Sequence, residues 1–328
     1  METKVLPITT ESLAEARAII RDGGLVAFPT ETVYGLGADA RNAAAVAGIF
    51  AAKGRPADNP LIVHICDKAQ VEEYARLTPL AEKLIEAYWP GPITLVLKKR
   101  DCIPDIVSAG LDSVGLRLPG SAAAREFLAA VGCPIAAPSA NTSGRPSPTA
   151  AAHVAEDMAG KVPLILDGGA VEIGLESTVV DARGEYPLVL RPGGITAEML
   201  RERCGGLLTK PQLPTQKPLA PGMKYTHYAP KGEVLLFATA AEGAALLSAH
   251  AEAQPLLIAS AEMAAELGYA DSFIPGKRGD LDAYARSIFA ALRLADSQSR
   301  SVILVETVPE EGLGVAIMNR LKKSAGVL

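Results

Sequence analysis

Cysteine and histidine are both scarce in this 328-residue sequence, with four residues of each. The cysteines include no C-x-x-C pair, so neither a disulfide framework nor a zinc site is expected, and a reducing cytosol is the simplest compartment. Because no H-x-x-x-H spacing occurs, any metal is expected to be Mg²⁺ carried by phosphate groups rather than held in a protein cage. Long apolar runs and a signal-peptide pattern are absent too, so we expect a cytoplasmic protein that does not enter a membrane.

An excess of basic residues is also absent. The net charge is −5, and residues 1–205 already account for it, with 20 Lys and Arg against 25 Asp and Glu. Neither part of the chain is basic, which argues against a large nucleic-acid footprint. The P-loop pattern G-x-x-x-x-G-K-[ST] and the hydrolase pattern G-x-S-x-G are missing as well, so P-loop nucleotide binding and a serine-hydrolase triad have no support.

One glycine pattern keeps a dinucleotide-binding alternative open. Residues 35–40 fit G-x-G-x-x-A, and Asp58 lies near the expected spacing of the acidic residue. However, Pro29, Thr30, Glu31 and Thr32 precede the pattern, and such residues do not suit a central buried strand. The match is therefore weak evidence for a nicotinamide-dependent oxidoreductase.

The chain length predicts two domains, because single cores stop growing near roughly 250–300 residues. Residues 1–205 mix helical and strand patterns, and some strands follow each other too closely for repeated βαβ units, which predicts an α/β domain with a twisted mixed sheet. Residues 206–230 are rich in proline and read as a linker. Residues 231–328 alternate as β-α-β-α, which predicts a small, mostly parallel, doubly wound Rossmann-like domain.

Lys53 and Arg55 flank a glycine just before a predicted buried strand at residues 61–65. Pro56 and Pro60 exclude a helix between them, because proline lacks the N–H group and clashes with the preceding turn. We therefore expect the two cations on a rigid loop beside a sheet, where they can hold phosphate or carboxylate. A solvated basic turn is the alternative.

Two further polar stretches are candidate ligand sites. Thr30, Thr32 and Tyr34 would share one face of a strand by its two-residue period, and could bind a small polar ligand or form a solvent-facing edge. Residues 138–147 supply serine and asparagine side chains, which are uncharged partners for phosphate and ribose, although the same composition is typical of a simple turn. His64, at the end of an apolar strand, is more often a packed core histidine than a ligand.

Six motifs within residues 1–205 occur in a characteristic order. They are Pro29-Thr-Glu-Thr-Val-Tyr-Gly-Leu-Gly37, Lys53-Gly-Arg-Pro-Ala-Asp-Asn-Pro-Leu-Ile-Val-His64, Trp89-Pro-Gly-Pro-Ile-Thr94, Arg117-Leu-Pro119, Ala137-Pro-Ser-Ala-Asn141 and Glu176-Ser-Thr178. Together they resemble the YrdC-like L-threonylcarbamoyladenylate synthases, whose signature pairs Lys-x-Arg with Ser-x-Asn. Pro221-Gly-Met-Lys-Tyr-Thr-His-Tyr-Ala-Pro230 and Gly314-Val-Ala-Ile-Met-Asn-Arg320 resemble the longer, two-domain branch of that family.

The resemblance implies condensation of L-threonine, bicarbonate and ATP into threonylcarbamoyl-AMP with release of pyrophosphate. Other proteins would then transfer the threonylcarbamoyl group to the adenosine beside the anticodon of certain tRNAs. By motif matching, the threonine site would comprise Thr32, His64, Arg117, Ala137 and Ser177. The ATP site would comprise Arg55, Asn59, Ser113, Ser139, Ser147 and Arg191, with Lys53 and Asn141 completing the signature and Tyr225, His227 and Tyr228 of the linker closing over the nucleotide.

Physical chemistry agrees with these implied roles. Arg117 can grip the carboxylate of threonine bidentately. Charge develops on the phosphates as the carbamate attacks, and Lys53, Arg55 and Mg²⁺ would stabilise it, so we expect catalysis by orientation without a protein nucleophile. We also expect the second domain to position the linker as a lid.

Two alternatives remain beside the synthase. An RNA-binding module is conceivable because YrdC-like domains resemble double-stranded RNA binders in fold and tRNA is the final target, but the acidic charge argues against phosphate-driven binding. Larger carbamoyltransferase maturation proteins contain a related domain, together with acylphosphatase-like and cysteine-rich zinc segments that this sequence lacks.

Overall fold

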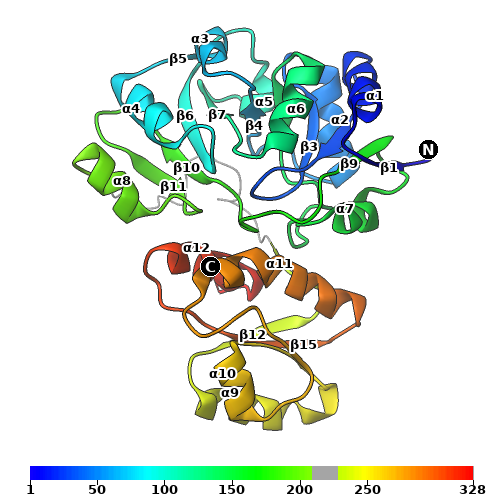
Figure 1. The fold of residues 1–328 in the computed structure, drawn as a ribbon, viewed down its shortest axis with the longest axis vertical. Helices are drawn as coiled ribbons and strands as arrows, with labels where there is room; N and C mark the ends of the chain where they lie inside the picture. The colour runs from blue at the N-terminus through cyan, green and yellow to red at the C-terminus, as the bar shows by residue number, and fades with distance from the viewer. Residues whose placement is uncertain (209–227, 328) are drawn as a thin grey trace.

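The computed structural model describes residues 1–208 and 228–327 (Figure 1). Over these residues the chain forms an eleven-stranded sheet and a separate four-stranded sheet, both combined with helices. The predicted α/β class, with a large mixed sheet and a second Rossmann-like unit, is confirmed. The limits predicted for the domains stay predictions, and most of the predicted linker, residues 209–227, lies outside the described residues.

The large sheet is mixed and runs in the order β1-β9-β2-β3-β8-β4-β7-β6-β10-β11, with β5 beside β6. Its parallel pairs include β4 with β7 and β6 with β10, whereas β3 with β8 and β6 with β7 are antiparallel. The strands are β1 Lys4–Pro7, β2 Val26–Phe28, β3 Gly35–Asp39, β4 Ile62–His64, β5 Ala75–Arg76, β6 Ile93–Lys99, β7 Ser113–Arg117, β8 Ile135–Ala137, β9 Leu164–Asp167, β10 Thr178–Asp181 and β11 Leu188–Arg191.

Helices of the first domain cover this sheet: α1 Thr10–Arg21, α2 Ala43–Lys53, α3 Val71–Tyr74, α4 Pro79–Tyr88, α5 Asp105–Ser108, α6 Ala122–Val131, α7 Ala151–Met158 and α8 Ala197–Cys204, with a 3₁₀ turn at Lys68–Gln70. Helix α2 positions the Lys53 region. It begins where the Asn42 side chain accepts hydrogen bonds from two backbone N–H groups, and it ends at Gly54, whose φ of 61° suits glycine. Val46 and Ile49 of α2 are fully buried in the main core, which fixes the direction of the helix.

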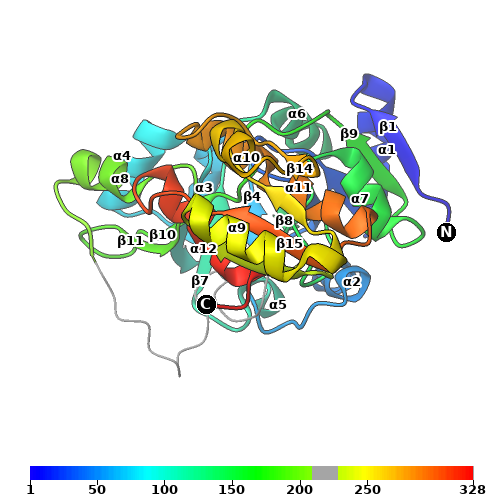
Figure 2. The same ribbon diagram turned by 90° about the horizontal axis from the view of Figure 1, so that it is seen from below.

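The small sheet is entirely parallel, in the order β12-β15-β13-β14. Its strands are β12 Glu233–Phe237, β13 Leu256–Ile258, β14 Ser272–Phe273 and β15 Val302–Glu306, and its helices are α9 Ala240–Ala249, α10 Ala261–Leu267, α11 Leu281–Ser297 and α12 Leu313–Ser324, with a 3₁₀ turn at Ala251–Ala253. Helices α9 and α10 cover the far face of the sheet, whereas α11 and α12 lie between the sheet and the first domain (Figures 1 and 2). The mostly parallel, doubly wound pattern predicted for this region is confirmed.

The two domains share an apolar cluster. Val33 and Leu175 of the first domain are buried in the same cluster as Phe289 of α11 and Ile317 of α12. Gly174 makes this approach possible, because a Cβ atom there would lie 2.4 Å from the carbonyl oxygen of Ala285. The second domain is therefore packed directly against the segment that leads into Glu176 and Ser177. Within the described ranges, no helix has both the length and the apolar character needed to span a bilayer.

Candidate active site

A cavity in the first domain brings together most of the residues implied by the motifs. The five residues assigned to threonine all line it: Thr32, His64, Arg117, Ala137 and Ser177. Six of the residues assigned to ATP line it as well: Arg55, Ser139, Asn141, Ser147, Arg191 and Tyr228. Lys53, Asn59 and Ser113 are buried but do not belong to its lining, and Tyr225 and His227 lie outside the described residues. The individual binding roles remain predictions.

Arg117 is held in place by Glu31 at one side of the cavity. Nη2 of Arg117 lies 2.7 Å from Oε1 of Glu31, and both side chains are almost fully buried. Burial alone would raise the pKa of Glu31, but the Arg117 charge and backbone N–H groups lower the pKa below its ordinary value. The carboxylate therefore stays ionised and fixes the guanidinium, which suits Arg117 to bind a substrate carboxylate at a defined position. The sequence motif contained Glu31, but only the structure identifies it as the partner of Arg117.

His64 lies next to Arg117, because β4 and β7 pair in parallel with these two residues opposite each other. Burial, and then the positive charge of Arg117, lower the pKa of His64 to about 3, so its imidazole is neutral at physiological pH. The Phe28 ring contacts it edge to face, with the ring centroids 5.8 Å apart. Nδ1 of His64 is buried and has no hydrogen-bond partner in the described part of the chain. A substrate hydroxyl or amine could supply that partner.

The pKa of His64 predicts a specific pH dependence of stability. Between about pH 6.5 and pH 3 the unfolded chain binds a proton at this histidine and the folded chain does not. The free energy of unfolding should therefore fall as the pH is lowered below 6.5, by about 1.4 kcal/mol per pH unit for this one group. Urea unfolding of the wild type and of His64→Gln at pH 7, 6 and 5 measures the difference.

The expected result is a shallower pH dependence in His64→Gln. Burial also lowers the pKa of His153, so some dependence should persist in the variant. Equal slopes in the two proteins would contradict the buried, neutral state of His64.

The segment ahead of β3 differs from the prediction. Residues 29–34 do not form a strand, and β3 begins only at Gly35. The Thr30 hydroxyl lies 2.8 Å from the Thr32 hydroxyl and donates to the carbonyl oxygen of Val33, so side-chain hydrogen bonds stabilise a turn here instead of an extended ladder. Thr30, Thr32 and Tyr34 nevertheless all line the cavity, although the shared strand face expected for them was wrong.

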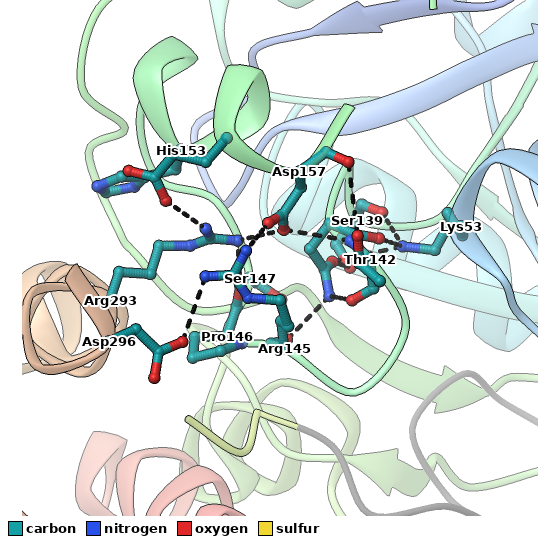
Figure 3. A network of polar contacts seen from close by, with 12 residues as sticks. Lys53, Ser139, Thr142, Arg145, Pro146, Ser147, His153, Asp157, Arg293 and Asp296 are labelled. Carbon is teal, nitrogen blue, oxygen red and sulfur yellow. Dashed lines mark hydrogen bonds and ion pairs between the residues drawn. The ribbon is translucent and has the colours of Figure 1, made fainter. Parts of the chain in front are cut away.

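Lys53 also lies differently from the expectation. It is the last residue of α2 rather than a loop residue, and its side chain is buried. Its ammonium group donates to the carbonyl oxygens of Ser139 and Asn141, the latter at 2.6 Å, and burial lowers its pKa well below the ordinary value. The loop position predicted for Lys53 is therefore wrong, because the direction of α2 aims the side chain behind the cavity. Lys53 holds the loop that carries Ser139 and Asn141 (Figure 3).

The Ser139-x-Asn141 motif completes the same hydrogen-bonded unit. The Ser139 hydroxyl lies 2.5 Å from Oδ1 of Asn141, and Nδ2 of Asn141 donates to the carbonyl oxygens of Thr142 and Arg145, both at 2.8 Å. Each polar group of the asparagine therefore helps to fix the loop. This arrangement gives a physical reason why Lys-x-Arg and Ser-x-Asn occur together, since the side chain of the lysine binds the segment that carries the serine and the asparagine.

Arg55 faces the cavity, unlike Lys53. Its Nη2 donates to the carbonyl oxygens of Asn59 and Pro60 at 3.2 and 3.4 Å. The Asn59 carboxamide and the Ser113 hydroxyl are buried and find no hydrogen-bond partner among the residues that the structure describes. Buried polar groups are normally satisfied, so these two side chains are unusual, but neither of them lines the cavity.

Asp157 of α7 lies at the centre of a network of polar contacts with Thr142, Arg145 and Arg293 (Figure 3). Its side chain is fully buried and forms ion pairs with Arg145, which lines the cavity, and with Arg293 of α11, at 2.7 Å from Nη2. It also accepts a hydrogen bond from the backbone N–H of Thr142 at 3.1 Å. The loop at residues 142–147 is thus fixed by a carboxylate that the second domain helps to neutralise.

Helix α11 reaches the same loop directly at two more points. Nη2 of Arg145 lies 3.2 Å from Oδ2 of Asp296, and Nη2 of Arg293 donates to the carbonyl oxygen of Pro146 at 2.7 Å. Tyr228 completes this wall: it lines the cavity and stacks on Phe289 of α11, with the ring centroids 5.1 Å apart. The second domain therefore supports the wall of the cavity that carries Arg145 and Ser147.

Glu176 is the acidic residue among those that line the cavity. Its Oε1 accepts a hydrogen bond from the Ser147 hydroxyl at 2.6 Å, and its Oε2 lies 3.0 Å from Nε of Arg320 of α12. The neighbouring Arg191 donates from Nη2 to the carbonyl oxygen of Ser177 at 2.9 Å. The motifs contained Glu176 and Arg320, but they are 144 residues apart, so the sequence offered no signal of their contact.

The charges of the lining indicate anionic ligands. Among the described residues of the lining, the guanidinium groups of Arg55, Arg117, Arg145 and Arg191 outnumber the single carboxylate, that of Glu176. In the described ranges no three His, Cys, Asp or Glu side chains come together as a metal site. The carboxylates of Glu31 and Glu176 are both paired with arginines. The cavity is suited to carboxylate and phosphate groups.

Two family models match the chain over almost its whole length. A model described as "Telomere recombination", of the Sua5, YciO and YrdC proteins, matches residues 18–193. A model described as "Threonylcarbamoyl-AMP synthase, C-terminal domain" matches residues 195–326. The first model alone covers more than half of the chain.

Relatives of known name are similar over the full length. A threonylcarbamoyl-AMP synthase of Bacillus subtilis is 42% identical over 331 aligned positions, covering 99% of this chain and 96% of the relative. One of Pyrococcus abyssi is 45% identical, covering 95% and 93%. The structure of P. abyssi Sua5 complexed with L-threonine superposes with a TM-score of 0.90 at 43% identity, covering 99% of this chain and 98% of that one.

Proposed function

This chain belongs to the two-domain Sua5/YrdC family of threonylcarbamoyl-AMP synthases, and we propose that its cavity condenses L-threonine, bicarbonate and ATP into threonylcarbamoyl-AMP and pyrophosphate. One observation supports the proposal above the others. One region of the cavity holds Arg117, which Glu31 fixes, beside the neutral His64. A second region of the same cavity is rich in guanidinium groups. The first region is suited to an amino acid and the second to a triphosphate.

The reaction needs two bond-forming steps. The neutral amine of threonine first adds to the carbon of bicarbonate, and loss of water gives a carbamate. A carbamate oxygen then attacks the α-phosphorus of ATP in line, and the bond to the bridging oxygen breaks so that pyrophosphate leaves with its electron pair. Mg²⁺ enters on the phosphates as part of the substrate.

The residues of the chain orient the substrates and neutralise their negative charges. Arg117 holds the threonine carboxylate, and the neutral His64 contacts the hydroxyl or amine without adding charge beside it. Arg55 and Arg191 stabilise the phosphates, and Ser139 and Ser147 offer hydrogen bonds to them. No covalent enzyme intermediate is required, so proximity and electrostatic stabilisation account for the rate.

Product analysis tests the proposal. The purified chain is incubated with L-threonine, Mg-ATP and either ¹²C- or ¹³C-bicarbonate, and the products are separated at once for mass spectrometry. We expect an adenylate that contains threonine and that becomes heavier with the labelled bicarbonate. AMP as the sole adenylate, with no incorporated label, would contradict the proposed condensation.

The pocket should discriminate only moderately between threonine and serine. The threonine methyl group is expected near the Ala137 side chain, and one methyl group in an apolar pocket changes the specificity by about 10–200-fold. We therefore expect kcat/KM for L-serine to be lower by about that factor. Steady-state rates with the two amino acids at saturating ATP measure it, and equal efficiencies would show that the pocket does not sense the methyl group.

Further partners follow from the chemistry of the product. We propose that the cytoplasm is the site of the reaction and that separate proteins transfer the threonylcarbamoyl group to tRNA. The alternative of a non-catalytic RNA-binding module is less favoured, because it leaves the converging arginines and buried polar groups of the cavity unexplained.

A further inference from the structure

Arg320 of the second domain reaches into the wall of the cavity. It is among the largest fully buried side chains of the described residues, although it sits on α12, outside the catalytic domain. Its Nε lies 3.0 Å from Oε2 of Glu176, and its Nη1 donates to the carbonyl oxygen of Pro192 at 2.6 Å. Its guanidinium carbon also lies 5.7 Å from the centroid of the Tyr228 ring. Arg320 thus contacts two residues that line the cavity without belonging to the lining itself.

The negative charge of Glu176 is unfavourable in the wall of a cavity that binds a triphosphate. A carboxylate that lines a cavity for a triphosphate repels the ligand unless a cation compensates it. Burial alone would raise the pKa of Glu176, but Arg320 and then Arg191 lower it, so the carboxylate is ionised. Its second oxygen meanwhile accepts the hydrogen bond from Ser147. The negative charge of Glu176 must therefore be balanced by a cation if this wall of the cavity is to bind a nucleotide.

We propose that Arg320 is a positioning residue for the nucleotide half of the site: it neutralises Glu176 and holds it against Ser147. The second domain thereby sets the affinity for ATP without touching ATP. This inference rests on the proposed use of ATP by the cavity. It assigns to α12 a role in substrate binding that is separate from the packing of the two domains.

The test compares Arg320→Met with the double variant Arg320→Met/Glu176→Gln in the full-length chain. Losing the cation should raise the KM for ATP about 10–100-fold, because a buried carboxylate that has lost its hydrogen-bonded arginine then lines the nucleotide side of the cavity. The KM for threonine should change less than about 3-fold, since Arg117 and Glu31 are untouched. The glutamine of the double variant is neutral and can still accept a hydrogen bond from Ser147. The KM of the double variant for ATP should therefore be at least about tenfold lower than that of Arg320→Met.

A purely structural role gives different results. If the two KM values rise together, or if Glu176→Gln restores nothing, Arg320 acts through domain packing and the proposal is wrong. Arg286→Met is the matched control: it removes another hydrogen bond between the domains, from Nε to the carbonyl oxygen of Glu172 at 2.9 Å, at a residue outside the lining. Its KM for ATP should equal that of the wild type.

Two further measurements test the proposal if Arg320→Met does not fold or if the protein shows no turnover. If Arg320→Met does not fold, the comparison is made between Glu176→Gln and the double variant. The ATP affinities of these two proteins should differ less than about 3-fold, and a larger loss in the double variant would overturn the proposal. Calorimetric binding of Mg with α,β-methylene-ATP reports on Arg320 even without turnover. An inactive wild type that binds this analogue would refute the proposed reaction alone, whereas an active wild type with an unaffected Arg320→Met variant would refute the inference alone.

Discussion

Replacing Arg55 with alanine is expected to lower kcat/KM for ATP by about 10²–10³-fold, the loss typical of removing one group that stabilises developing charge. The guanidinium lines the cavity, and the backbone carbonyl oxygens of Asn59 and Pro60 orient it. The carbamate attack places additional charge on the phosphates, where such a cation acts most strongly. Pyrophosphate release at varied ATP concentration, with threonine and bicarbonate saturating, measures the effect.

The hydrogen bonds from Arg55 to the carbonyl oxygens of Asn59 and Pro60 are long, at 3.2 and 3.4 Å, so losing these two bonds in Arg55→Ala should cost little stability. Arg41→Ala is the matched control, since Arg41 is an exposed arginine paired with Asp39, and surface pairs contribute only about 0–1 kcal/mol. We expect wild-type kinetics for Arg41→Ala. Wild-type kinetics for Arg55→Ala would contradict the role of Arg55 as the main cation of the proposed phosphate site.

Replacing Lys53 with methionine should act mainly on stability. The methionine keeps an apolar stem but removes the ammonium group that binds the carbonyl oxygens of Ser139 and Asn141. Each of the two buried carbonyl oxygens left without a donor costs about 1–3 kcal/mol, so the free energy of unfolding should fall by about 2–6 kcal/mol. Activity should fall as well, because the loop that carries Ser139 and Asn141 loses its anchor.

Urea unfolding of Lys53→Met and of Lys68→Met, an exposed lysine in the 3₁₀ turn at Lys68–Gln70, separates the effect from a simple loss of charge. The Lys68 variant should match the wild type. A fully stable but inactive Lys53→Met variant would instead favour the role expected for Lys53 on physical grounds, in which it stabilises the charge that develops on the phosphates.

Contiguous motifs predicted much of the cavity. The strand predicted at residues 61–65 is recognisable from its branched apolar residues and contains β4, and Arg117, Ser177 and Arg191, which the motifs assign to substrate binding, all line the cavity. Periodicity failed at residues 29–34, because hydroxyl groups of Thr30 and Thr32 hydrogen-bond within the segment and compete with strand pairing.

Long-range partners could not be predicted. Glu31 pairs with Arg117 across 86 residues, and Arg293 pairs with Asp157 across 136. Single-sequence patterns report local periodicity and carry no information on which distant charges meet. The direction of Lys53 was missed for a related reason, since the packing of α2 rather than the local motif decides where its side chain points.

One of the three linker residues expected to close over the nucleotide, Tyr228, lies in the described part of the chain. Tyr225 and His227 lie outside the described residues, whereas Tyr228 is buried between the cavity and Phe289 of α11. The contact shows that the end of the predicted linker is bound by the second domain. It supports a shared role of Tyr228 and Arg320 at the nucleotide side.

Pyrophosphate release by the purified full-length chain tests the central claim most directly. The chain is supplied with Mg-ATP, and threonine and bicarbonate are added singly and together. We expect rapid release only when both are present, and its loss in Arg55→Ala. Release that ignores threonine, or a folded protein that releases none and binds RNA instead, would contradict a cavity built to join these three substrates.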